Sequence, residues 1–280
     1  MMPSSAPTQA FSINLTRDEL LALLQLMGST TMNGLPEDPF AGISRRERAE
    51  RLNAGLETLL NRGLIEAQGG DSVVIDDTLV ALVGSCVLPG ASMVLSGLQP
   101  DGIADPHFFN ATPEILVEHS SPRPGIHIFT FLPDEVALAE RVQWVLAAIG
   151  SAHHGADFAI VSSDKLIADV FRWSRNNQTA KAADSLVKAN WPAGEAQSFV
   201  RSCAGFAIYT GLCAWGLRSE QIEGTHTLIA VSDQQRCWLL EPQGERGDLL
   251  RCRSVTGQDA TDAMVRMAHP LLQIANAGEK

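Results

Sequence analysis

The sequence predicts an α+β protein: an antiparallel β-sheet with flanking helices, arranged as two related halves. Three observations support this prediction. Capping residues precede apolar-periodic helical stretches, apolar segments of strand length follow one another across short turns, and the second half of the chain repeats the pattern of the first. Consecutive strands that are joined by short turns pair antiparallel. Two such halves with helices on the sheet would share one core about a quasi-twofold axis.

The N-terminal segment, residues 13–75, follows a tail (1–12) and predicts two helices and a hairpin. Thr16 with Glu19 forms a capping box ahead of the first helix, and Ser44 with Glu47 forms the same pattern ahead of the second. Short apolar strands over residues 64–75 then flank a glycine turn. The order of helix, helix and hairpin is winged-helix-like.

The internal repeat is the main clue to the rest of the fold. Residues 115–146 align with residues 238–269 at an offset of 238 − 115 = 123, and shorter matches upstream have slightly smaller offsets. The first half, residues 76–150, is predicted to contain a helix at 76–87, strands at 91–98, 107–111, 115–119 and 126–132, and a helix at 134–148. The second half, residues 194–275, is predicted to contain a helix at 194–204, strands at 206–215, 226–231, 237–241 and 249–255, and a helix at 259–274. The alternative is that two stretches of similar pattern are unrelated.

The connector, residues 151–193, predicts a small helical subdomain. Two short helices fit between Ser163 and Trp191, with a turn at Asn176 and Asn177. Residues 276–280 form a terminal tail. The domain organisation is therefore two α/β half-repeats separated by a helical connector and preceded by the winged-helix-like segment.

Composition excludes several classes of function. The chain has 280 residues, a formal net charge of −11, 45% hydrophobic residues and 19% charged residues, which is a globular composition. A general nucleic-acid or anionic-membrane surface needs clustered positive charge, so neither partner is expected. Apolar runs such as 79–83 and 144–149 are far shorter than the roughly 20 residues of a membrane span. Residues 1–10 lack the features of a signal peptide, and cytoplasmic residence is the expectation.

No residue pattern predicts catalysis, a cofactor or a metal. Five cysteines without a CxxC pair are typical of buried thiols in a reducing compartment. His153, His154 and Asp157 suggest a metal cluster, but adjacent histidines on a strand point to opposite faces, which favours a solvated loop. Ser162 and Lys165 have the spacing of a serine nucleophile and its lysine, although a helix cap at the neighbouring Ser163 or Asp164 explains them better. The chain is predicted not to be an enzyme.

A winged-helix DNA-binding regulator is the alternative function. The second helix carries a basic cluster of Arg45, Arg46, Arg48 and Arg51. Residues 1–66 nevertheless contain six basic and eight acidic side chains, 6 − 8 = −2. Glu47 and Glu50 alternate with the arginines at spacings that favour a salt-bridged, solvated helix face. A scaffold role is preferred to DNA recognition.

The order of elements, together with four short stretches, resembles the EspG family of cytosolic chaperones of type VII (ESX) secretion. The stretches are LTRDELLALL at 15–24, LLNRGLI at 59–65, WPAGEA at 191–196, and the strand 237–241 followed by 254–267. The resemblance implies an α+β fold with a quasi-twofold sheet and helical subdomains. It also implies a function: binding the helical tip of a secreted PE–PPE-type pair and keeping that apolar tip soluble until export.

A chaperone of this kind needs apolar side chains exposed on a stable scaffold. Residues 98–108 are interpreted as a loop that presents such side chains, because their counterpart at 217–226 is polar. Tryptophans are enriched at binding hot spots and add two candidates. The predicted partner-binding residues are Leu98, Gln99, Ile103, Phe108, Trp173 and Trp191. Core packing is the alternative for Phe108 and for both tryptophans.

Overall fold

A single antiparallel sheet organises the computed structural model, which describes residues 11–36, 38–69, 72–99, 102–150, 152, 155–205, 207–217, 222–233, 235–244 and 247–279. Ten strands pair in the order β1-β7-β6-β5-β4-β9-β10-β11-β12-β8, and every pair is antiparallel. The predicted α+β fold class is confirmed. The strands are β1 (Ser12–Thr16), β4 (Ala91–Gln99), β5 (Gly102–Thr112), β6 (Ile115–Arg123), β7 (Ile126–Phe131), β8 (Ala159–Ser163), β9 (Ala207–Trp215), β10 (Gly224–Ser232), β11 (Cys237–Gln243) and β12 (Leu249–Val255). A separate hairpin pairs β2 (Ile65–Ala67) with β3 (Val73–Ile75).

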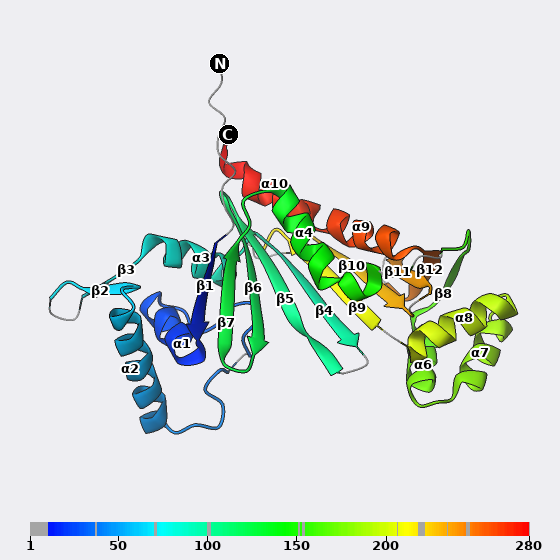
Figure 1. The fold of residues 1–280 in the computed structure, drawn as a ribbon, viewed down its shortest axis with the longest axis horizontal. Coiled ribbons are helices and arrows are strands. Elements are labelled where there is room, and N and C mark those ends of the chain that lie inside the picture. Colours follow the sequence, from blue (N-terminus) through cyan, green and yellow to red (C-terminus); the bar gives the residue numbers. More distant parts are fainter. Residues whose placement is uncertain are drawn as a thin grey trace, which may run out of the picture.

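Helices cover the sheet in three groups (Figure 1). The helices are α1 (Arg17–Leu26), α2 (Arg45–Asn61), α3 (Asp77–Val87), α4 (Glu135–Val145), α5 (Ala147–Gly150), α6 (Asp164–Arg175), α7 (Thr179–Lys188), α8 (Ala193–Ala204), α9 (Gly257–Met267) and α10 (His269–Ala275). A short 3₁₀ turn, Asn276–Glu279, ends the described chain. The caps that the sequence predicts are present: the side chains of Thr16, Ser44 and Ser163 each accept a backbone hydrogen bond at the start of α1, α2 and α6.

The same order of strands occurs on both sides of the central β4–β9 pair. Outward from β4 the sheet runs β5, β6, β7 and β1, and outward from β9 it runs β10, β11, β12 and β8. In the central pair Ala91 lies opposite Trp215, and Leu98 lies opposite Ile208. A helix precedes each central strand, α3 before β4 and α8 before β9, and further helices follow β7 and β12.

The sequence analysis missed the two edge strands, β1 and β8. Each has five residues and directly precedes a capped helix, and in each only the fourth residue is buried: Leu15 in β1 and Ser162 in β8. Their partners are distant in sequence, β7 for β1 and β12 for β8. So short a segment with one buried side chain has little local pattern, and its pairing is set by the neighbouring strand.

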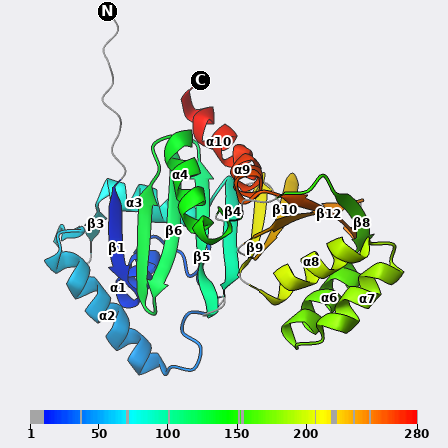
Figure 2. The same ribbon diagram turned by 45° about the vertical axis from the view of Figure 1, so that its right-hand side comes forward.

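Alternate side chains of the strands enter separate cores on the two faces of the sheet. On one face Met93, Phe109 and Tyr209 pack beneath α4, α5, α9 and α10. The other face is covered at its two ends (Figures 1 and 2). Helices α1–α3 form a core there with β6 and β7, and helices α6–α8 form one with β10–β12. The middle of this second face, on β4 and β9, lies between the two groups.

Three predicted boundaries are wrong. The segment between residues 98 and 108 is not a loop, because β5 begins at Gly102 and pairs with β4 almost to its end. The C-terminal helix is two helices that divide at Ala268, where the following Pro270 lacks an N–H donor and disfavours a continuous helix. The helix that follows β7 likewise ends at Val145, and Leu146 separates it from α5.

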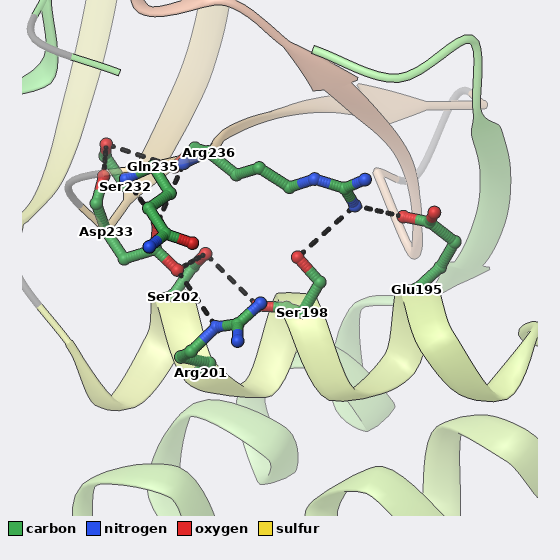
Figure 3. A network of polar contacts seen from close by, with 8 residues as sticks. All are labelled: Glu195, Ser198, Arg201, Ser202, Ser232, Asp233, Gln235 and Arg236. Atoms are coloured by element: carbon green, nitrogen blue, oxygen red, sulfur yellow. Dashed lines mark hydrogen bonds and ion pairs between the residues drawn. The ribbon is translucent and has the colours of Figure 1, made fainter. Parts of the chain in front are cut away.

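A polar network attaches α8 to the β10–β11 turn (Figure 3). Asp233 caps the turn by accepting the backbone N–H groups of Gln235 and Arg236, both at 2.8 Å. On the α8 side Ser202 Oγ donates to the same carboxylate at 3.2 Å, and Arg236 Nη1 lies 2.8 Å from Glu195 Oε2. The network fixes the position of the α6–α8 group relative to the sheet.

Candidate functional site

The middle of the second sheet face exposes an apolar row. Phe108, Val94, Leu212 and Thr227 lie opposite one another across β5, β4, β9 and β10. Phe108, Val94 and Thr227 are half-buried, and the Leu212 side chain is 41% exposed. Helix α3 packs on β5, β6 and β7, whereas α8 packs on β9, β10 and β11, so neither helix covers the whole row. A leucine on a central strand is normally buried.

The neighbouring rows of this face are apolar or carry hydroxyl groups. Leu98 lies opposite Ile208, and Ser96 lies opposite Thr210. Neither β4 nor β9 contains a charged residue. We call the surface of Val94, Ser96, Leu98, Phe108, Thr210, Leu212 and Thr227 the docking face; Ile208, at its edge, packs against the α6–α8 core. Its chemistry suits an uncharged apolar partner.

Two of the predicted partner-binding residues belong to the docking face. Leu98 and Phe108 are half-buried there, on β4 and β5. Gln99 and Ile103 lie on the same hairpin, but their side chains are outside the described part of the structure. Sequence reasoning missed Val94, Leu212 and Thr227. They alternate with core residues as on any strand, and nothing local shows that the helices leave their face uncovered.

The two tryptophans lie away from the docking face, in the α6–α8 group. Trp191 is only 2% exposed and packs among Phe199, Trp238 and Phe158. Its Nε1 donates to Ser162 Oγ at 2.8 Å, so the buried indole is satisfied. This geometry agrees with the packing alternative for Trp191. Trp173 is half-buried on α6, with the Lys181 ammonium 4.4 Å from its ring centre.

A buried carboxylate lies on the opposite, helix-covered face. Glu118 on β6 is contacted by Arg141 at 2.6 and 2.8 Å and by His107 Nδ1 at 2.6 Å. Burial alone would raise the pKa of Glu118, but these hydrogen bonds lower it below the usual value of 4.5. Arg141 also stacks on Trp144 at 4.5 Å. The cluster joins α4 to β5 and β6, and its ion pairs balance the charge of the buried carboxylate.

The residues that the sequence suggests for metal binding or catalysis either have structural contacts or lie outside the described residues. His153 and His154 are outside them, and within the described part of the chain no group of three potential metal ligands comes together. Ser162 accepts from Trp191, and Lys165 is exposed in the first turn of α6. Cys86, Cys203, Cys213, Cys237 and Cys252 are buried free thiols, and burial raises the pKa of each. No described helix has the length and apolar character to span a membrane.

The arginine cluster of α2 is largely engaged within the N-terminal segment. Arg46 pairs with Glu50 and Arg51 pairs with Glu47, each at 2.7 Å, and Arg48 lies 4.2 Å above the ring of Phe40. These contacts are the salt-bridged helix face that the spacing predicts. They leave fewer cations available for phosphate contacts than a DNA-reading helix uses.

Comparison with known proteins identifies a solved structure with the same fold. No family model and no curated protein matches the sequence. The structure is similar to a solved one, the Mycobacterium tuberculosis type VII secretion system chaperone EspG5 in complex with a PE25–PPE41 dimer, with a TM-score of 0.65 and 12% identity. The match covers 96% of this chain and 99% of that one. This chain has the fold of EspG5. The resemblance that the sequence suggests is therefore confirmed at the level of fold.

Proposed function

We propose that the protein is a non-enzymatic cytosolic chaperone that holds the helical tip of a secreted protein on its docking face until export. The observation that carries the proposal is the exposure of Leu212 and its row in the middle of a ten-stranded sheet. EspG5, which has the same fold, forms a complex with a PE25–PPE41 dimer. A PE–PPE-type pair is accordingly the client class that we infer for this chain.

The physical basis of the proposed complex is burial of apolar area. Contiguous exposed apolar surface is favourable to cover, at roughly 25 cal/mol per Å² removed from water. Hydroxyl groups at Ser96, Thr210 and Thr227 can bond the free carbonyl groups at the end of a helix. The net charge of −11 keeps the free chaperone from associating through this apolar face.

We also infer that the two halves are related by a quasi-twofold axis beside Val94 and Leu212. Support comes from the common strand order and from Thr16 and Ser163, which cap α1 and α6 directly after the equivalent edge strands. The repeat would then extend over residues 12–150 and 159–275. It would include the N-terminal segment and the helical connector, which the sequence analysis assigned to separate domains.

The test compares two leucines of nearly equal exposure. Leu212 is 41% exposed on the docking face, and Leu249 is 40% exposed at the start of β12 on the other face. The tagged wild-type protein should recover one predominant helical client, a secreted protein or pair, from its native cytoplasm. Leu212→Asp should abolish recovery, because a charge would be buried without a partner, whereas Leu249→Asp should retain it. Recovery of no client by wild type, or equal recovery by both variants, refutes the proposal.

A further inference from the structure

A strap from the α1–α2 connection, residues 29–35, covers one end of the docking face. A Cβ atom on Gly34 would lie 2.6 Å from His119 Nδ1 and 2.9 Å from the Phe108 ring. The strap backbone therefore rests directly on both rings, and Gly34 adopts a φ of +92° that disfavours other residues. Phe108 is the end of the apolar row that the strap partly hides.

Polar contacts of Asn33 and burial of Met32, which is 6% exposed in the core of α1–α3, hold the strap in place. Its side-chain Nδ2 donates to Asn110 Oδ1 at 2.8 Å and to Ser92 Oγ at 3.1 Å. Its carbonyl oxygen lies 3.1 Å from His119 Nδ1. Because a carbonyl oxygen only accepts, Nδ1 of His119 carries the proton in this contact.

His119 is in turn bonded to a second buried histidine. Its Nε2 lies 3.0 Å from His127 Nδ1, and since Nδ1 of His119 holds the proton, Nε2 accepts from His127. His119 stacks against Phe129 at 4.8 Å and against Phe108 at 5.8 Å between ring centres. The pair is satisfied in its neutral form. A proton added to both rings would place a positive charge on each within a buried aromatic stack.

The surrounding charged groups do not stabilise a protonated pair by direct contact. The Glu118 and His107 side chains lie on the opposite face of the sheet, where they bond each other. The Glu118 charge raises the pKa of His119 through space, but burial lowers this pKa by more. Arg17 of α1 acts on His127 electrostatically as a like charge, and its Nη2 donates to the carbonyl of Pro39 at 2.6 Å. The remaining neighbours of His119 are the Phe108 and Phe129 rings and the strap backbone.

We propose that residues 29–35 are a displaceable strap latched by the His119–His127 pair, and that protonation of the pair releases the strap and extends the docking face over Phe108. The effect on client binding rests on the proposed function, whereas release of the strap does not. If the strap stays closed at acid pH while Leu212→Asp still abolishes client recovery, only the latch is refuted.

The linkage between protonation of His119 and release of the strap sets the size of the expected pH effect. Burial, with the neighbouring His127 charge, lowers the pKa of His119 from 6.5 to about 3 in the closed form. In the released form the imidazole reaches water and regains a pKa of ~6.5. Lowering the pH from 7.5 to 5.0 should therefore raise the ratio of released to closed strap about 30-fold.

The experiment is hydrogen–deuterium exchange of the full chain at pH 7.5 and pH 5.0, with rates corrected for intrinsic exchange. The strap amides of wild type should lose at least tenfold protection at pH 5.0, while β11 amides keep theirs. His119→Gln, whose amide can still donate to Asn33 and does not titrate, should lose less than threefold. Gly34→Ala, which displaces the strap sterically, should be unprotected at both pH values.

Three results would overturn the latch. They are a loss below tenfold in the wild-type strap, an equal loss in His119→Gln, or a parallel loss in β11, which would indicate general unfolding. If His119→Gln does not fold, Gly34→Ala decides: strap protection that still depends on pH in this variant also overturns the proposal.

Discussion

Trp191 shows at the residue scale how burial divides binding candidates from packing residues. Its indole lies among Phe158, Phe199 and Trp238 and donates to Ser162, so it has no free surface to offer a partner. Leu212 has the opposite character, a large apolar side chain that is 41% exposed. A sequence shows that both residues are apolar, but their different environments are set by helices distant in the chain.

Replacement of Trp191 by alanine should destabilise the fold. We expect a loss of about 3–5 kcal/mol in the free energy of unfolding, because a fully packed indole leaves a cavity in the α6–α8 core. Urea denaturation followed by circular dichroism measures the change. Trp144→Ala, which removes a ring that is 61% exposed, is the control and should change the free energy by less than about 1 kcal/mol. Equal effects of the two changes would contradict the assignment of Trp191 to the core.

Glu118 should make stability depend on acid pH. Its pKa is lower in the folded chain than the usual 4.5, so its contribution is present above pH 4.5 and is lost as the pH falls through the folded value. Glu118→Gln should cost about 3–5 kcal/mol at pH 7, because Arg141 and His107 lose their buried partner. The difference in unfolding free energy between wild type and variant should shrink as the pH falls from 5 to values below 4.5. A difference that stays constant over this range would contradict the ion-pair assignment.

At the scale of elements, local signals were predictable and long-range ones were not. Caps such as Thr16, Ser44 and Ser163 depend on residues three positions away, and the structure contains all three. The edge strands β1 and β8 depend on partners in β7 and β12, so their short local patterns do not predict that they are strands. Of the residues on the face that we propose for docking, the sequence singled out only Leu98 and Phe108, because which face stays uncovered depends on where two separate helical groups pack.

The network around Asp233 should control how firmly α8 holds to the sheet. Asp233→Ala removes the acceptor for two turn amides and for Ser202, and we expect a loss of about 1–3 kcal/mol. Hydrogen exchange should increase in the β10–β11 turn and in α8 and remain unchanged in α1. Asp248→Ala, at an exposed position before β12, is the control and should leave both regions protected. Unchanged exchange in α8 of Asp233→Ala would show that the network does not anchor the helix.

At the scale of the whole molecule, the sheet acts as a platform between two helical groups. The EspG5 fold explains why one face has covers only at its ends, because each half carries its own helical group at the outer strands. The face left between the groups has no charged residue on β4 or β9. Binding there should therefore rest on apolar burial and depend little on salt, unlike binding through surface ion pairs.

The most direct measurement of the central claim is photo-crosslinking in living cells from a photoreactive phenylalanine analogue placed at position 212 or at position 249. These positions have nearly equal exposure on opposite faces of the sheet. We predict that position 212 captures one predominant helical secreted protein, identified by mass spectrometry through residues of its apolar tip, and that position 249 captures none. No capture at position 212, or capture of the same client at both positions, would contradict the assignment of this face to client binding.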